Sequence, residues 1–99
     1  MPRPPVLPKE AVDLFLADHP GWSSDGHKIS KTFIFSSYAA ALAFVVRVAL
    51  RAERDDHHPD LALSWGKVRV DFATHEPRGL TVLDLDGARA AELAYGGAP

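Results

Sequence analysis

Hydrophobic and polar residues follow two different periods along the chain, and each period predicts one type of element. A period of two predicts strands, which we expect at residues 22–24, 27–35, 61–65 and 67–72. The clearest of these is 67–72, where Val68, Val70 and Phe72 alternate with charged residues. Asp25-Gly26 lies between the first two runs and is typical of a two-residue hairpin turn. The first pair of strands is therefore expected to be antiparallel.

A helical period predicts three helices, over Lys9–Asp18, Tyr38–Asp55 and Asp84–Tyr95. The middle helix is apolar nearly all the way round, because Arg47 is the only charged residue between Tyr38 and Leu50. Such a helix has to be buried on two sides. One side can face a sheet, and we expect the other to face a second subunit. The alternative is that the two shorter helices cover that side.

The elements follow one another as helix, two strands, helix, two strands, helix. This order predicts an α+β fold with two layers, in which a four-stranded antiparallel sheet carries three helices on one face. We expect one domain over residues 1–99, with a core from about 9 to 95. Residues 1–8 include four prolines and predict an extended arm. Residues 74–81 predict a loop, and 96–99 a frayed tail.

Composition and charge narrow the classes of function. The 99 residues contain 46% apolar residues, a formal net charge of −2 and no cysteine. The chain therefore lacks the excess positive charge of nucleic-acid binders, and disulfides and thiolate sites are excluded within it. The start of the sequence shows no secretory signal, and the apolar run 38–50 is too short for a membrane span, which needs about 20 residues. We expect a cytoplasmic protein with no membrane partner.

Three histidines lie where chemistry is plausible. His57 and His58 precede Pro59 at the end of the long helix, and His75 follows the last predicted strand. Imidazoles both donate and accept protons near neutral pH, so a pocket containing several suits an acid–base reaction such as a dehydration. Glu53 lies four residues before His57, so it shares a helix face with it if the helix continues, and it can then fix the imidazole tautomer.

Each of these residues also has a purely structural interpretation. A His-His-Pro sequence at a helix end can simply interact with the helix dipole, and Glu53 can belong to a solvated helix end. Asp84 can cap or start the last helix, and Trp65 can belong to the core. A metal site is a weaker alternative, because adjacent histidines point in different directions and no helical His pair is present.

The spacing of these residues resembles that of the pterin-4a-carbinolamine dehydratases. The family pattern is an acidic or polar residue, His-His-Pro after three residues, a later aromatic residue, a third histidine and an Asp. In this sequence the matching residues are Glu53, His57-His58-Pro59, Trp65, His75 and Asp84. The similarity extends over roughly residues 10–95. Two positions depart from the family, with Leu61 where many members have Trp and Trp65 where Tyr is common.

The resemblance implies a hydro-lyase, a 4a-hydroxytetrahydrobiopterin dehydratase that needs neither a metal nor an organic cofactor. Its product is quinonoid dihydropterin, formed in tetrahydrobiopterin recycling. By resemblance His57, His58 and His75 are the catalytic trio, in which His57 and His75 move protons and His58 holds the pterin. The substrate-binding residues implied are Glu53, Asp56, Pro59, Ala73, Thr74, Glu76 and Asp84, with Leu61 and Trp65 as possible pocket walls.

The resemblance also implies partners. Members of the family form homodimers or homotetramers, and the pterin links them to aromatic amino acid hydroxylases. A binding or assembly module that acts through its oligomer surface, with or without catalysis, is the alternative function. The presence of all three histidines together favours the enzyme, because a scaffold has no physical need of them.

Overall fold

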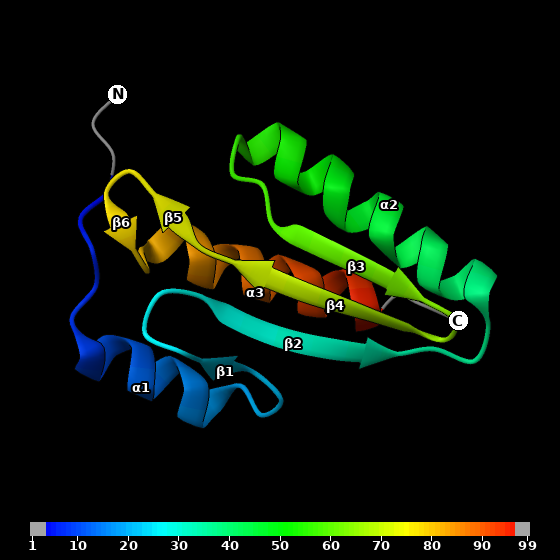
Figure 1. Cartoon of the computed structure of the whole chain (residues 1–99), viewed down its shortest axis with the longest axis horizontal. Coiled ribbons are helices and arrows are strands. Elements are labelled where there is room, and N and C mark those ends of the chain that lie inside the picture. Colours follow the sequence, from blue (N-terminus) through cyan, green and yellow to red (C-terminus); the bar gives the residue numbers. More distant parts are fainter. Residues whose placement is uncertain (1–3, 97–99) are drawn as a thin grey trace.

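A computed structural model describes residues 4–96, and its centre is a four-stranded antiparallel sheet of order β1-β2-β4-β3. Figure 1 shows the helices against this sheet and the short β5–β6 hairpin beyond the end of β4. The elements are α1 (Lys9–Asp18), β1 (Ser23–Ser24), β2 (Ile29–Ile34), α2 (Tyr38–Asp55), β3 (Asp60–Ser64), β4 (Lys67–Phe72), β5 (Thr74–His75), β6 (Arg78–Gly79) and α3 (Val82–Gly96). The predicted α+β architecture and order are confirmed. Residues 1–3 of the predicted arm and 97–99 of the predicted tail lie outside the described residues.

The sheet register places the core on one face. Ile29 is opposite Phe72 and Phe33 is opposite Val68, and all four side chains are buried. The alternate pairs, Ser30 with Asp71 and Thr32 with Arg69, lie on the other face. The apolar face carries the helices, as the alternation of β4 predicted.

Lys31 explains why the alternation in β2 looks irregular. It lies opposite Val70 on the core side of the sheet. Its Nζ donates a 2.6 Å hydrogen bond to Glu92, which also accepts one from the Trp22 indole at 2.9 Å. A lysine is therefore accommodated on the inner face because a carboxylate of α3 pairs with it.

Helix α2 is buried on one side only. It begins at the cap Ser37, whose hydroxyl accepts from the Ala40 N–H. Its buried residues, which face the core, are Ala41, Phe44, Val48 and Ala52. On the opposite side large apolar residues are 45–66% exposed, namely Tyr38, Leu42, Val46 and Leu50. The alternative that the two short helices cover the second side of α2 is thus wrong for residues 4–96.

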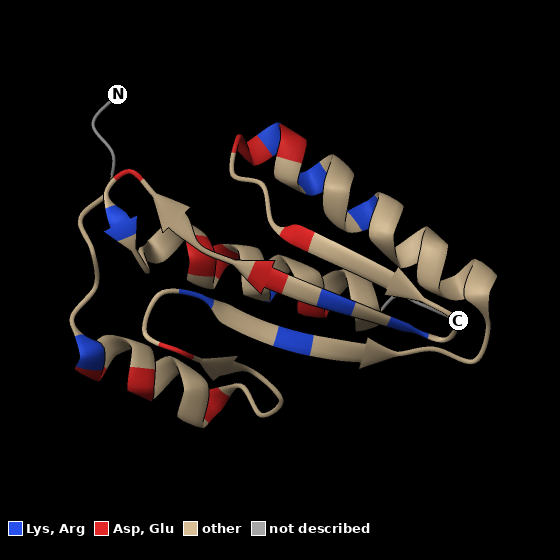
Figure 2. Cartoon of the chain, in the orientation of Figure 1, with Lys and Arg blue, Asp and Glu red and all other residues tan. Residues whose placement is uncertain are grey.

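Charge is unevenly distributed along α2. Figure 2 shows no Lys, Arg, Asp or Glu in its first half and several in its second half. Its exposed apolar side thus has few charged neighbours toward the N-terminal end. Among residues 4–96, no helix has the combined length and hydropathy that crossing a membrane requires.

Three sequence-based predictions need correction. Residues 74–81 are not a plain loop, because β5 and β6 pair there as a two-stranded sheet. Helix α3 begins two residues before Asp84, at Val82. Trp65 is not in the core: it lies in the turn between β3 and β4 and is 73% exposed. The turn at Gly66, which has a φ of +69°, ends β3 at Ser64. The alternation of the strand therefore does not include Trp65.

Candidate active site

The end of α2 places two histidines side by side on a reversing chain. Asp56 caps the helix in the left-handed region, with a φ of 52°, and its N–H donates to the Ala52 and Glu53 carbonyls. The His57 N–H also donates to the Ala52 carbonyl, at 3.2 Å. The helix therefore ends two residues before His57, short of what a helical Glu53–His57 pair requires, and the chain turns toward β3.

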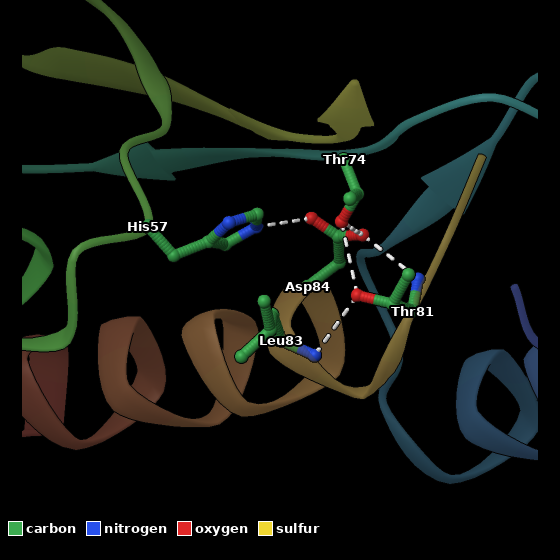
Figure 3. A network of polar contacts seen from close by, with 5 residues as sticks. All are labelled: His57, Thr74, Thr81, Leu83 and Asp84. Atoms are coloured by element: carbon green, nitrogen blue, oxygen red, sulfur yellow. Dashed lines mark hydrogen bonds and ion pairs between the residues drawn. The ribbon is translucent and has the colours of Figure 1, made fainter. Parts of the chain in front are cut away.

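His57 is oriented by a buried carboxylate from α3. Its Nε2 lies 2.6 Å from Oδ1 of Asp84, whose side chain is fully buried. The other oxygen, Oδ2, accepts the Thr74 hydroxyl at 2.8 Å and the Thr81 N–H at 2.9 Å (Figure 3). A buried carboxylate needs such donors, since an unpaired charge in the interior is costly. The imidazole of His57 is thus held by a fixed partner.

Thr81 is a site residue that the sequence-based analysis missed. Its hydroxyl lies 2.9 Å from that of Thr74 and accepts the Leu83 N–H at 3.2 Å. The Thr81 N–H donates to Asp84, so the start of α3 resembles a capping box in which the Thr81 hydroxyl accepts from Leu83 instead of Asp84. The spacing Thr81-x-x-Asp84 is the signal that could have revealed it.

Glu53 serves a different histidine from the one expected. Its carboxylate lies 2.7 Å from Nε2 of His58, and both side chains are exposed, at 78% and 55%. The condition under which Glu53 could orient His57 is not met, because α2 ends at Asp55 and the two residues share no helix face. An exposed ion pair of this kind contributes little, about 0–1 kcal/mol.

A hollow of about 450 Å³ gathers most of the predicted site residues. It is lined by Asp56, His57, His58, Ala73, Thr74, His75 and Glu76. The three histidines thus come from two separate segments of the chain, one after α2 and one in β5. A hollow with convergent titratable groups is the place where acid–base chemistry is possible.

A larger groove of about 1000 Å³ runs between α2 and α3 and shares only His57 with the hollow. Its walls are mainly arginine and aliphatic side chains, including Arg47, Leu50 and Leu93. It holds no second histidine. We therefore place the candidate active site in the smaller hollow.

Five of the predicted residues do not line that hollow, namely Glu53, Pro59, Leu61, Trp65 and Asp84. Leu61 is half-buried in β3, opposite Val70 on the core face. Trp65 lies at the end of β3 that is farther from His58, and Pro59 only leads into the strand. Thr74 lines the hollow, but its hydroxyl points inward to Asp84. These placements give Thr74 a supporting contact and leave Trp65 outside the pocket.

Two further observations concern charge around the site. A hydrogen bond from the Arg51 guanidinium holds the pKa of Asp55 below its ordinary value, so this carboxylate is tied to its own helix. Within residues 4–96 no group of three His, Cys, Asp or Glu side chains is arranged to hold a metal ion.

Comparison with known proteins assigns the family. The profile of the family described as pterin 4 alpha carbinolamine dehydratase matches residues 5–94. The chain belongs to the pterin-4a-carbinolamine dehydratase family. A relative from Roseiflexus castenholzii, provisionally named as such a dehydratase, is 46% identical over 82% of this chain and 87% of its own length. One from Nocardia farcinica, also provisionally named, is 43% identical over 85% and 88%.

Solved structures of dehydratase-like proteins share this fold. A crystal structure of a transcriptional coactivator/pterin dehydratase from Brucella melitensis superposes with a TM-score of 0.87 at 33% identity, covering 93% of this chain and all of that one. A pterin dehydratase-like protein described as a RuBisCO assembly factor of the alpha-carboxysome superposes with a TM-score of 0.62 at 24% identity, covering 82% of this chain and 95% of that one. The second likeness concerns the fold alone.

Proposed function

We propose that this protein is a 4a-hydroxytetrahydrobiopterin dehydratase. It removes water from the pterin-4a-carbinolamine and forms quinonoid dihydropterin, in support of aromatic amino acid hydroxylases in the cytoplasm. The observation that carries the proposal is the hollow in which His57, His58 and His75 meet, with His57 held by buried Asp84. Family membership and a cysteine-free sequence also support it.

The reaction needs two proton transfers and no redox change. The hydroxyl on C4a leaves as water after it receives a proton, and the N5 proton is removed as the C4a–N5 double bond forms. We assign these transfers to His57 and His75, and exchange with solvent restores both imidazoles. His58, on the exposed side of the hollow, is assigned to holding the pterin.

The size of the catalytic task fits this small site. Positioned acid–base groups typically give about 10²- to 10⁴-fold acceleration. Two imidazoles in one hollow supply such groups without help from another molecule. A flat pterin ring can also pair with polar groups at the hollow's edge, where Ala73 and Glu76 provide backbone atoms.

The proposal is tested by following quinonoid dihydropterin in absorbance while a pterin-dependent hydroxylase generates the carbinolamine in situ. We expect His75→Ala and His57→Ala each to lower the acceleration by about 10²-fold or more. His27→Ala is the matched control, because His27 lies in the exposed turn between β1 and β2 and should retain full activity. Variants as active as wild type would contradict the assigned roles.

We also propose that the protein is a homodimer or homotetramer. The exposed apolar side of α2, with Leu50 66% exposed, supports this. Burial of such a face against a second copy would remove it from water, which is favourable. If His75→Ala abolished catalysis while the oligomer and a biological role both persisted, the binding or assembly function would be the better account.

A further inference from the structure

The hydrogen bonds around Asp84 fix the direction of every donor in the cluster. Thr81 Oγ1 accepts the Leu83 N–H, so the proton of the Thr81 hydroxyl is still available for donation. The Thr74 hydroxyl has a single proton, which it donates to Asp84 Oδ2. The 2.9 Å contact between the two hydroxyls must therefore use the proton of Thr81. The donors run in series from Leu83 through Thr81 and Thr74 to the carboxylate.

This series determines what remains for His57. The Thr74 hydroxyl and the Thr81 N–H both occupy Oδ2, so Oδ1 faces the imidazole alone. A carboxylate oxygen and an unprotonated ring nitrogen are both acceptors and repel each other at 2.6 Å. Nε2 therefore carries the proton and donates it to Oδ1. Neutral imidazole has one N–H, and the lone pair is then on Nδ1.

Nδ1 of His57 is the ring nitrogen that Asp84 leaves unpaired, on a side chain that is 9% exposed. Among the described residues it has no hydrogen-bond partner, and Arg47 Nε is the only buried side-chain nitrogen or oxygen there that lacks one. Nδ1 is therefore not a buried orphan. His57 lines the hollow that also contains His58 and His75, so its free nitrogen can reach a molecule bound there.

We propose that Thr74 and Thr81 are positioning residues which, through Asp84, set the tautomer of His57, so that Nδ1 is the atom that exchanges a proton with the pterin. The inference rests on the proposed function for the identity of the pterin. It gives the Thr74 hydroxyl a role in addition to the expected substrate contact of this residue, since its one proton goes to the buried carboxylate of Asp84.

The tautomer can be measured directly by two-bond ¹H–¹⁵N correlation spectra of the wild-type protein in alkaline solution, where imidazoles are neutral. A His57→Gln spectrum assigns the signals of His57 among the five histidines. We expect the proton on Nε2 and the lone pair on Nδ1. A proton on Nδ1 would overturn the inference.

Asp84→Asn provides a sharper test because it predicts a reversal. The Thr81 N–H requires an acceptor, so the amide oxygen should occupy the Oδ2 position and the NH₂ group should face Nε2. The amide would then donate to Nε2 and force the Nδ1–H tautomer. We expect this reversed signal and a loss of kcat of about 10²-fold or more, the size of an acid–base contribution. An unchanged tautomer and an unchanged kcat would overturn the inference.

Asp86→Asn is the matched control for that experiment. Asp86 carries the same substitution on the same helix, but it is exposed and pairs with Arg89. We expect wild-type kcat and a wild-type His57 signal. A reversed His57 signal in this control would contradict the inference, because it would show that the tautomer does not depend on the contact with Asp84.

The contribution of Thr74 is tested with Thr74→Val and Thr74→Ser. Valine keeps the shape but removes the hydroxyl, and we expect it to lower kcat about tenfold and to increase the minor tautomer of His57. Serine retains the donor and should restore kcat to within about threefold of wild type. Wild-type kcat and tautomer in Thr74→Val would contradict the role; if this variant does not fold, the wild-type and Asp84→Asn spectra decide.

These measurements separate the inference from the proposed function. The spectra need no substrate, so an Nδ1–H tautomer in an active dehydratase would overturn the inference alone. A protein that shows the Nε2–H tautomer but does not accelerate dehydration would overturn the proposed function and, with it, proton exchange with a pterin.

Discussion

His57 and His58 are neighbours in the sequence, yet their carboxylate partners lie in very different surroundings. Asp84 is fully buried and accepts two further hydrogen bonds, whereas Glu53 is 78% exposed. Electrostatic interactions are stronger where water is excluded. The contact of His57 therefore fixes a single geometry, while that of His58 can be replaced by water.

This contrast predicts a small effect for Glu53→Gln. Glutamine keeps the oxygen that faces His58 but removes the charge of an exposed pair, which is worth about 0–1 kcal/mol. We expect kcat/KM to fall by less than about fivefold, measured in the same dehydratase assay. A loss as large as that of Asp84→Asn would show that the exposed pair is as important as the buried one.

The residues that line the hollow could be predicted from the sequence, whereas Thr81 and the pairing of the side chains could not. Imidazoles and carboxylates stand out by type and spacing, and His57, His58 and His75 indeed line one hollow. The pairing depends on where α2 ends. The helix ends because Asp56 adopts left-handed backbone angles. Asp tolerates such angles but does not require them, so its presence in the sequence does not predict where α2 ends.

At the scale of elements, strands and helices whose pattern extends over several residues were predictable, as was the two-residue β1 beside Asp25-Gly26, whereas β5 and β6 were not. Val68, Val70 and Phe72 show their strand by alternation over six residues, from Lys67 to Phe72. Strands β5 and β6 have two residues each, too few for any period. The inward position of Lys31 depends on Glu92, which is 61 residues away in the sequence.

Gly87 lowers the helix propensity of α3 but leaves room for the Phe72 side chain of β4. Glycine disfavours a helix interior by about 1 kcal/mol relative to alanine. In α3, however, a Cβ at this position would lie within 2.8 Å of three carbon atoms of the Phe72 ring. Phe72 is buried, and its ring stacks on His57 with 6.1 Å between centroids. The glycine therefore allows α3 to approach β4 beside the site.

We accordingly expect Gly87→Ala to destabilise the protein although it improves helix propensity. Overpacking typically costs about 1–3 kcal/mol, and contacts as short as 2.4 Å to a buried ring place this substitution at about 2–3 kcal/mol, above the gain of about 1 kcal/mol. The free energy of unfolding, measured by urea denaturation, should fall by about 1–2 kcal/mol. Gly96→Ala is the control, because nothing lies within 4 Å of its added Cβ and no loss is expected. Equal or greater stability of Gly87→Ala would contradict the close packing.

At the scale of the whole molecule, antiparallel pairing brings distant segments to one edge. β4 lies between β2 and β3, and its end leads directly into β5 with His75. The end of α2 and the start of α3 meet there, so that His57 contacts Asp84 across 27 residues of sequence. The overall α+β arrangement followed from the order of elements, and the second apolar side of α2 that the sequence predicted is exposed in the chain.

That exposed side predicts association between copies of the chain. We expect sedimentation analysis to give a dimer or tetramer for wild type, and a lower mass for Leu50→Glu, because a charge at this position opposes burial against a second copy. Leu14→Glu on α1 is the control: Leu14 is similarly exposed, at 69%, but lies on another helix. A wild-type monomer at all concentrations would contradict the prediction.

The central claim is that the hollow catalyses loss of water from a pterin carbinolamine. The most direct test is the rate at which quinonoid dihydropterin appears with wild-type protein, compared with the spontaneous rate in buffer. We expect the wild-type protein to accelerate this reaction at least about 10²-fold, and His57→Ala to abolish the acceleration without loss of the fold. A wild-type rate equal to the spontaneous one, with tetrahydrobiopterin-derived and other carbinolamines alike, would contradict it.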